Sequence, residues 1–376
     1  MIDLELSSTS TSSTKPDDLN VTVSFRVDAN TKIGGGHFMR CIALAHGFVN
    51  GGARCLFLVE RETLKFVEQL ESFSFPLEVY DLGCENEIDW IDKICVKMAS
   101  RVVVLDGYQF NANFRQALSG LDALLVVIDD DNSNGELFAD FIVNPVSRAV
   151  KLGYEHTSPR AKLLLGPNYT LLRPEFTSIS SGHLHREYAE REDLLISFGA
   201  SDVGNMTIPL LEKILSSRRG VEPVTVVTGA AYLRKESLVS LIEEVGDHSG
   251  LVTHLHQVNN MATVMKNAKM AVSAAGGTVF ELAAMGVPTI LLVVADNQLN
   301  AALEQQSMGW CRVIDAREAF SCDSLMQQIE VIWNDDAMRV RMSRIALENA
   351  VTGGADRVAN EILQVLSQSE LDNVDA

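Results

Sequence analysis

The sequence predicts an α/β protein with two doubly wound, Rossmann-like domains that face a common cleft. Short runs of Val, Ile and Leu alternate with amphipathic helical patterns along the 376 residues, and such runs are typical of parallel strands buried on both faces. The alternation weakens between residues 167 and 191 and then restarts. Glycine-bearing turns follow several predicted strands, at the edge where open parallel sheets bind their ligands.

The first half of the chain carries the first of these patterns. Strands are predicted at residues 21–27, 54–59, 77–80, 101–105, 124–128 and 141–143. Helices are predicted between them, at residues 39–50, 62–71, 90–99 and 113–118. Strands joined by helices favour a parallel sheet covered on both faces, so we assign residues 21–170 to an N-terminal Rossmann-like domain. Residues 1–20, rich in Ser, Thr and acidic side chains, predict a disordered tail.

The second half repeats the alternation. Strands are predicted at residues 194–198, 224–228, 251–255, 270–273, 289–293 and 311–314. Helices are predicted at residues 206–216, 235–244, 261–267, 278–285, 299–308 and 322–334. We assign residues 192–345 to a second Rossmann-like domain. Residues 171–191, with Pro174 and Gly182, are expected to form a linker, and residues 346–376 a C-terminal helix and tail that could pack on either domain.

Composition narrows the class of partner and the compartment. The net charge of −19 argues against nucleic acid and against stable association with an anionic membrane. Gly276, Glu281 and Pro288 interrupt the apolar stretch 270–295, which favours a buried α/β segment over a membrane span. The six cysteines form no CxxC pair, and residues 1–20 lack a signal-peptide pattern, so a reducing cytoplasm is expected. No metal-ligand spacing occurs, so no metal or cofactor is predicted, and a monomer is compatible with the sequence.

The stretch 24–41 is the most informative part of the chain. A predicted strand ends in Asp28, the glycines 34–36 follow, and His37 and Arg40 open the next helical pattern. Glycines let backbone N–H groups approach a ligand, and a helix N-terminus favours negative charge. A histidine there could move a proton beside a phosphate-bearing ligand. A glycine-rich turn with a histidine as helix cap explains the spacing equally well.

Two acidic turns follow strands of the same domain. Asp106-Gly107-Tyr108 would face the cleft beside His37 if the two strands are neighbours, although an ordinary turn is the simpler interpretation. The run Asp129–Asp131 suggests a metal site or a cap, and a solvated turn with a helix cap is favoured.

Three turns of the second domain carry groups suited to a nucleotide sugar. Small residues at strand-to-helix turns expose N–H groups to an anion, a glutamate can accept from ribose hydroxyls, and amide side chains match sugar hydroxyls, although Asn or Asp capping is the alternative. The candidate residues are Gly199, Ser201, Asp202, Ser273, Ala275, Gly276, Gly277, Thr278, Glu281, Asn297 and Gln298.

Taken together, the second-half turns resemble the donor-nucleotide half of GT-B glycosyltransferases. The opening motif is similar to the UDP-2,4-diacetamido-2,4,6-trideoxy-β-L-altropyranose hydrolase family of pseudaminic acid biosynthesis, whose pattern is R-x-D-x-S-x-x-I-G-x-G-H-x-x-R. The matching residues are Arg26, Asp28, Ile33, Gly34, Gly36, His37 and Arg40. The family's serine falls at Asn30 or Thr31, a departure from the pattern. Further similar segments follow in order at residues 106–108, 128–130, 165–176, 197–202, 273–281 and 297–298.

The resemblance implies metal-independent, inverting hydrolysis at the anomeric carbon. UDP and a free 2,4-diacetamido sugar would be released for pseudaminic acid, a nonulosonic acid of flagellin or surface glycans. By the same resemblance His37 is the general base, Tyr108 orients the water or the histidine, and Asp28 orients the region. The resemblance also implies substrate contacts, with the turn at 273–278 on the diphosphate and Glu281 on the ribose. The other implied contacts are Gly34, Gly35, Gly36, Arg40, Arg173, backbone near Met261 on uracil, and Asn297 and Gln298 on sugar or phosphates.

Two other functions stay open on the sequence. The first is a GT-B glycosyltransferase that uses a UDP-sugar and an acceptor other than water, since a fold does not fix a function. The second is a non-catalytic protein that binds nucleotide sugars.

Overall fold

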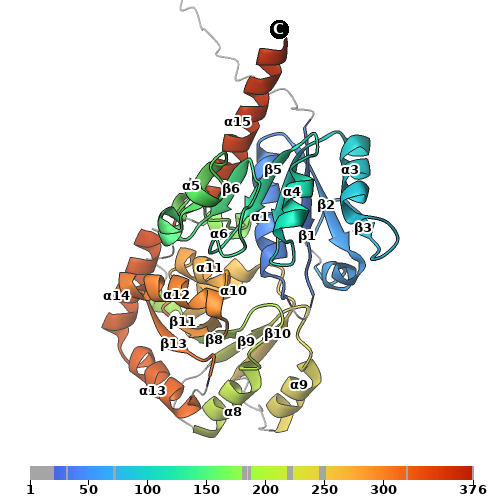
Figure 1. The fold of residues 1–376 in the computed structure, drawn as a ribbon. Coiled ribbons are helices and arrows are strands. Elements are labelled where there is room, and N and C mark those ends of the chain that lie inside the picture. Colours follow the sequence, from blue (N-terminus) through green and yellow to red (C-terminus); the bar gives the residue numbers. More distant parts are fainter. Residues whose placement is uncertain are drawn as a thin grey trace, which may run out of the picture.

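The computed structural model describes residues 21–30, 33–70, 73–179, 184, 188–217, 223–244, 251–318 and 321–374. The predicted tail at residues 1–20, and Thr31 and Gly182, lie outside them. Two parallel sheets, each covered by helices, lie one above the other (Figure 1). All strands of the upper sheet fall within residues 21–170 and those of the lower within residues 192–345. The division into domains at these bounds stays a prediction.

The first sheet has the strand order β3-β2-β1-β4-β5-β6-β7, and every pair is parallel. Its strands are β1 (Thr22–Val27), β2 (Arg54–Glu60), β3 (Leu77–Tyr80), β4 (Ser100–Asp106), β5 (Leu124–Ile128), β6 (Phe141–Asn144) and β7 (Lys162–Leu165). The order reverses between β1 and β4, and open sheets bind ligands at such a switch point. The sequence did not predict β7, a four-residue edge strand too short to show a pattern.

The helices of the first domain connect its strands, and asparagine side chains cap two of them in the described residues. They are α1 (Gly36–Asn50), α2 (Leu64–Val67), α3 (Glu87–Met98), α4 (Ala112–Leu118) and α5 (Tyr154–Thr157). The Asn86 and Asn111 side chains accept N–H groups at the starts of α3 and α4. The helix predicted at residues 62–71 is instead a 3₁₀ turn, Arg61–Thr63, followed by the short α2.

The second sheet has the order β10-β9-β8-β11-β12-β13, again parallel throughout. Its strands are β8 (Asp193–Ser197), β9 (Val224–Thr228), β10 (Val252–His256), β11 (Ala268–Ala274), β12 (Thr289–Val293) and β13 (Cys311–Asp315). Its helices are α8 (Thr207–Ser217), α9 (Lys235–Glu244), α10 (Met261–Asn267), α11 (Thr278–Ala284), α12 (Asp296–Met308) and α13 (Cys322–Trp333). The switch point here lies between β8 and β11.

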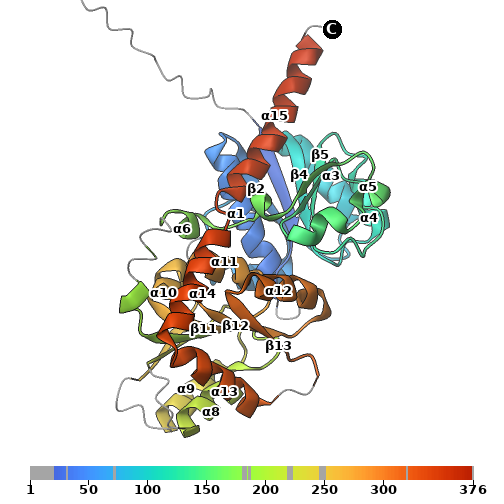
Figure 2. The same ribbon diagram turned by 90° about the vertical axis from the view of Figure 1, so that its left-hand side faces the viewer.

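The chain crosses between the sheets twice. After β7 it passes through α6 (Pro174–Thr177) into the second domain. It returns between α14 (Asp336–Asn349), which packs on the second domain, and α15 (Gly354–Val374), which packs on α1 (Figure 2). Arg357 on α15 donates to the Asn168 carbonyl at 2.6 Å, so the two crossing segments touch. The last helix thus completes the first domain.

The core explains why the strands read as continuous apolar runs. Every residue of β1 is buried, and Phe25 stacks on Phe57 of β2 at 4.9 Å between ring centroids. Val358 and Ile362 of α15 are fully buried in the same cluster. Each such side chain stabilises the fold by about 1.5–3 kcal/mol relative to its exposed state.

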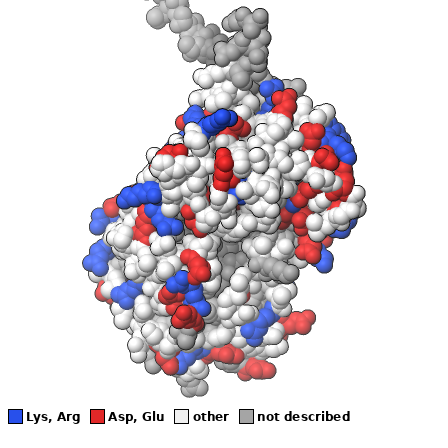
Figure 3. All heavy atoms as spheres, in the orientation of Figure 1, with Lys and Arg blue, Asp and Glu red and all other residues white. Residues whose placement is uncertain are grey.

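The surface carries both signs of charge. Figure 3 shows Lys and Arg side chains interspersed with Asp and Glu on one face of the molecule. None of the helices in the described part of the chain is long and apolar enough to span a bilayer. The predicted absence of a nucleic-acid partner stays a prediction.

Candidate active site

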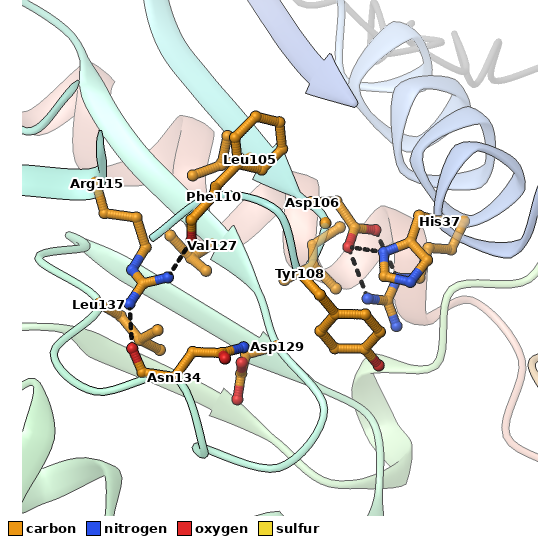
Figure 4. Close-up of a pocket in the computed structure, with 13 residues that line it drawn as sticks. His37, Leu105, Asp106, Tyr108, Phe110, Arg115, Val127, Asp129, Asn134 and Leu137 are labelled. Carbon is orange, nitrogen blue, oxygen red and sulfur yellow. Dashed lines mark hydrogen bonds and ion pairs between the residues drawn. The ribbon is translucent and has the colours of Figure 1, made fainter. Parts of the chain in front are cut away.

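A histidine and a buried aspartate meet at the switch point of the first sheet. His37 lies in the first turn of α1, and Asp106 is the last residue of β4, paired in register with Val27 of β1. Nδ1 of His37 is 2.8 Å from Oδ1 of Asp106, whose side chain is completely buried (Figure 4). Because an ionised carboxylate only accepts, Nδ1 carries the proton and Nε2 is left as an acceptor. This arrangement orients an imidazole as a base.

Arg40 holds the aspartate ionised. One turn after His37, its Nε and one terminal nitrogen donate to the Asp106 carboxylate at 2.6 and 2.7 Å, and the other terminal nitrogen donates to Asp130 at 2.6 Å. Burial would raise the pKa of Asp106, but Arg40 and His37 outweigh it and lower that pKa. The same balance lowers the pKa of Asp130 to about 2. All three guanidinium nitrogens of Arg40 are therefore bonded within the protein, and its substrate contact stays a prediction.

Tyr108 joins this network to the second domain. Its hydroxyl donates to Asp130 and accepts from Nδ2 of Asn297, the second residue of α12, at 2.9 Å. Its ring lies edge-on to the His37 imidazole, 4.9 Å away between centroids. Burial and the Asp130 carboxylate raise the pKa of the phenol, so it stays neutral near pH 7. Since its one proton goes to Asp130, its oxygen can serve a ligand only as an acceptor.

A pocket opens beside His37 and Asp106 in the first domain. Its apolar lining includes Leu105, Phe110 and Leu137 (Figure 4). Arg115, a buried residue of the lining, donates to the carbonyls of Phe110, Asn134 and Glu136 and so ties together two loops that form the wall of the pocket.

The three glycines before His37 have different surroundings. Gly34 has φ +74°, which favours glycine, and its N–H donates to the Asn30 carbonyl at 2.9 Å. A Cβ on Gly35 would lie 2.4 Å from the Phe66 ring and 3.2 Å from Cβ of Ala200 in the second domain, whereas one on Gly36 would meet nothing within 4 Å. The absence of a side chain at Gly35 therefore leaves space for Phe66 and Ala200, and of the three glycines only Gly36 adjoins open space. The substrate contact predicted for all three stays a prediction.

Asp28 is bonded to groups at or after the ends of both strands that flank β1, which are β2 and β4. It pairs with the buried Arg26 at 2.7 Å and accepts from the N–H of Glu60 at 2.7 Å and from Thr63 and Gln109 at 3.2 Å. None of these described partners is His37. A catalytic role stays a prediction, and the contacts are those of a residue that fastens the end of β1.

In the turn between β8 and α8, the side chain of Asp202 caps the helix. The two carboxylate oxygens of Asp202 accept the N–H groups of Met206 and Thr207, each at 2.9 Å. Gly199 in the same turn has φ +77°. Ser201 faces the first domain, with its Oγ 3.7 Å from the position of a Cβ on Gly34. The capping alternative thus accounts for the contacts of Asp202, and its substrate contact stays a prediction.

The turn after β11 offers open backbone. Ser273 is buried at the end of the strand, and the Ala275 N–H donates to Leu292 of β12 at 2.9 Å. A Cβ on Gly277 would meet nothing within 4 Å, and one on Gly276 only Nε2 of Gln298, at 4.0 Å. Gln298 accepts the Val294 N–H at 3.0 Å, which directs its amide toward this turn. Thr278 begins α11.

Two predicted ligand contacts pair with each other. Arg173 donates from one terminal nitrogen to Oε1 of Glu281 at 3.0 Å, and its other terminal nitrogen lies 2.7 Å from Glu175. Burial raises the pKa of Glu281, and Arg173 opposes that shift. Met261 begins α10 and packs partly buried against the second domain's core.

Two acids of the site were not predicted as site residues. Asp106 was noted after its strand, but the sequence does not show that β4 is the neighbour of β1. Asp129 is buried and accepts from the Tyr154 hydroxyl and the Asn132 N–H, whereas Asp130 binds Arg40 and Tyr108. The interpretation as a solvated turn with a helix cap was therefore wrong for both residues. In the described segments no group of three or more His, Cys, Asp or Glu side chains is placed to hold a metal ion, and independence from metals stays a prediction.

Comparison with known proteins agrees with this architecture. Residues 197–358 match the family described as Glycosyltransferase family 28 C-terminal domain. The structure is similar to MurG of Acinetobacter baumannii, with a TM-score of 0.63 and 14% identity over 92% of this chain and 99% of that one. The fold is that of the GT-B glycosyltransferases. It is also similar to S. aureus MnaA, solved with UDP, with a TM-score of 0.63 and 11% identity over 92% and 97% of the chains.

Two relatives are similar in sequence over most of this GT-B chain. MJ1062 of Methanocaldococcus jannaschii is 24% identical over 273 residues, which is 72% of this chain and 55% of that protein. The chain therefore spans about half the length of the archaeal relative. The spore coat polysaccharide biosynthesis protein SpsG of Bacillus subtilis is 22% identical over 255 residues, 66% of this chain and 72% of SpsG.

Proposed function

We propose that the protein hydrolyses a UDP-linked 2,4-diacetamido-2,4,6-trideoxy sugar at its anomeric carbon. The observation that carries the proposal is the contact between His37 and Asp106, 2.8 Å long, at the switch point of the first sheet. In the described residues Nε2 of His37 has no hydrogen-bond partner, so it can accept a proton from water. The ordered motifs of the sequence support the class of sugar, and the similarity to SpsG, a spore coat polysaccharide biosynthesis protein, supports a role in carbohydrate synthesis.

The chemistry needs one proton transfer and one displacement. His37 Nε2 takes a proton from water, the water oxygen bonds to the anomeric carbon, and the bond from that carbon to the diphosphate oxygen breaks with inversion. UDP leaves with the bonding electrons. Asp106 stabilises the imidazolium that forms, and the neutral oxygen of Tyr108 accepts from the water and orients it.

The second domain would bind the leaving group. The open turn at Gly276 and Gly277 would present N–H groups to the diphosphate, and Glu281 would accept from the ribose hydroxyls. The match of residues 197–358 to a glycosyltransferase domain supports a nucleotide site in this half. The similarity of the fold to MnaA, which was solved with UDP, supports UDP as the nucleotide. We place the reaction in the cytoplasm, without nucleic acid, stable membrane association or metal.

A glycosyltransferase is the second candidate, because the matching domain is described as one. The two functions separate when candidate UDP-2,4-diacetamido sugars are incubated without an acceptor. UDP release is followed by a coupled assay, and the product anomer by proton NMR. The hydrolase releases UDP and one inverted anomer, whereas a transferase releases UDP only when an acceptor is added.

The variant His37→Ala tests the base. We expect UDP release to fall by about 10²–10⁴-fold, the usual contribution of a positioned general base. Equal rates in wild type and variant would remove His37 from the mechanism. Binding of UDP without turnover of any candidate sugar would favour a binding protein.

A further inference from the structure

The ion pair between Arg173 and Glu281 gives Arg173 a different task from the substrate contact that the motif implies. Arg173 lies just before α6, whose Phe176 is buried in the same cluster as Val279 and Leu282 of α11. Its guanidinium also lies over the Phe176 ring, 5.1 Å from the centroid. Arg173 is thus fixed relative to α11 by packing as well as by charge.

The guanidinium of Arg173 is largely buried and contacts two acidic side chains. Its side chain is 10% exposed, one terminal nitrogen donates to Glu281, and the other pairs with Glu175. Its Nε is buried and has no partner in the described residues. The guanidinium is therefore held between two carboxylates of the protein, Glu281 and Glu175.

By contrast, only one of the two carboxylate oxygens of Glu281 accepts a hydrogen bond in the described residues. Oε1 accepts from Arg173, and Oε2 has no partner among the residues that the structure describes. We propose that Arg173 is a positioning residue, which holds Glu281 ionised and turned so that its second oxygen binds the ribose hydroxyls of the nucleotide. The inference rests on the proposed function, because it needs a nucleotide in this half.

The physical reason lies in the cost of a buried charge. Burial and the nearby Glu175 raise the pKa of Glu281, and Arg173 is the cation that opposes them. Replacing Arg173 by a neutral residue leaves a buried carboxylate next to another acid, which favours the protonated form. A protonated carboxyl group is a weaker acceptor for hydroxyls than a carboxylate.

The test measures UDP affinity by calorimetry between pH 5.5 and 8 for wild type, Arg173→Gln, Glu281→Gln and the double variant. Arg173→Gln should weaken UDP binding about tenfold at pH 6, the loss of one charge-assisted hydrogen bond, and the loss should shrink as pH rises. Binding needs the ionised acid, so it persists above the pKa of Glu281 and is lost as pH falls through it. Arg173→Gln moves that midpoint upward, and Glu281→Gln abolishes it.

The double variant should bind UDP no more weakly than Glu281→Gln alone. Losses that multiply, or a loss in Arg173→Gln that does not change with pH, would overturn the inference. Glu175→Gln is the matched control and should bind UDP at least as well as wild type. If Arg173→Gln fails to fold, Arg173→Lys keeps the charge and should bind with an unshifted pH midpoint; a shifted midpoint contradicts the role. A wild type that binds no UDP would instead refute the proposed function.

Discussion

The two domains bring different chemical groups to the proposed site. On the first domain the functional groups are side chains locked in a charged network, in which Arg40 joins Asp106 to Asp130. On the second domain the turn at Gly276 and Gly277 is open backbone. The carboxylate of Asp202 in that domain accepts N–H groups at the start of a helix. Fixed side chains suit proton transfer, and open N–H groups suit an anion. The contrast therefore predicts that turnover and nucleotide affinity can be lost separately.

The largest separation should come from Asp106→Asn. An asparagine can donate to Nδ1 of His37 and so favour the wrong tautomer, which in a comparable His–Asp pair costs on the order of 10⁴ in kcat. We expect a loss of about 10³-fold or more, with the Kd for UDP within about threefold of wild type. Steady-state kinetics and calorimetry measure the two. Asp131→Asn, which changes a neighbouring acid outside the network, is the control, and equal losses in kcat and UDP affinity would contradict the division of labour.

The opposite separation should come from Gly277→Val. The backbone there has φ −57°, and no atom lies within 4 Å of the added Cβ, so the fold can accept the side chain. It would fill the space that we assign to the diphosphate. We expect UDP to bind at least about tenfold more weakly, as when a ligand loses one or two hydrogen bonds, with an unchanged melting temperature. Unchanged UDP affinity would move the diphosphate elsewhere.

A smaller effect is expected for the hydrogen bond between Asn297 of the second domain and Tyr108 of the first. Asn297→Ala removes the 2.9 Å hydrogen bond to Tyr108. One such bond contributes about 0.5–1.5 kcal/mol, so kcat should fall by roughly 2–13-fold if it orients the phenol. Asn300→Ala on the same helix is the control. If Asn297 instead binds only the sugar, KM rises and kcat is unchanged.

The sequence located the turn residues better than it located the residues that they contact. Among the residues that the structure describes, the alternating pattern located the twelve strands other than β7, and the glycines and acids after β1, β4 and β11 were found as turn residues. The strand order is set by long-range packing, so the pairing of β1 with β4, and with it the contact of His37 with Asp106, could not be read from local pattern. Asp202 shows a second limit of prediction from sequence, because an aspartate after a strand can cap a helix or bind a ligand. Gly35 shows a third limit, because a glycine can leave space for neighbouring protein side chains as well as for a substrate.

The smallest functional effect is expected for Asp202→Ala, which tests that second limit. Loss of the cap on α8 should destabilise the second domain by about 0.5–2 kcal/mol, seen as a lower melting temperature, while UDP affinity stays within about twofold. Asp202→Asn keeps an acceptor and should recover most of the stability. Because the two carboxylate oxygens are already bonded to N–H groups of the helix, a tenfold loss of UDP affinity at an unchanged melting temperature would mean that this carboxylate exchanges its cap for the ligand. The second domain would then bind its ligand through a side chain, as the first domain acts through side chains in the proposed mechanism.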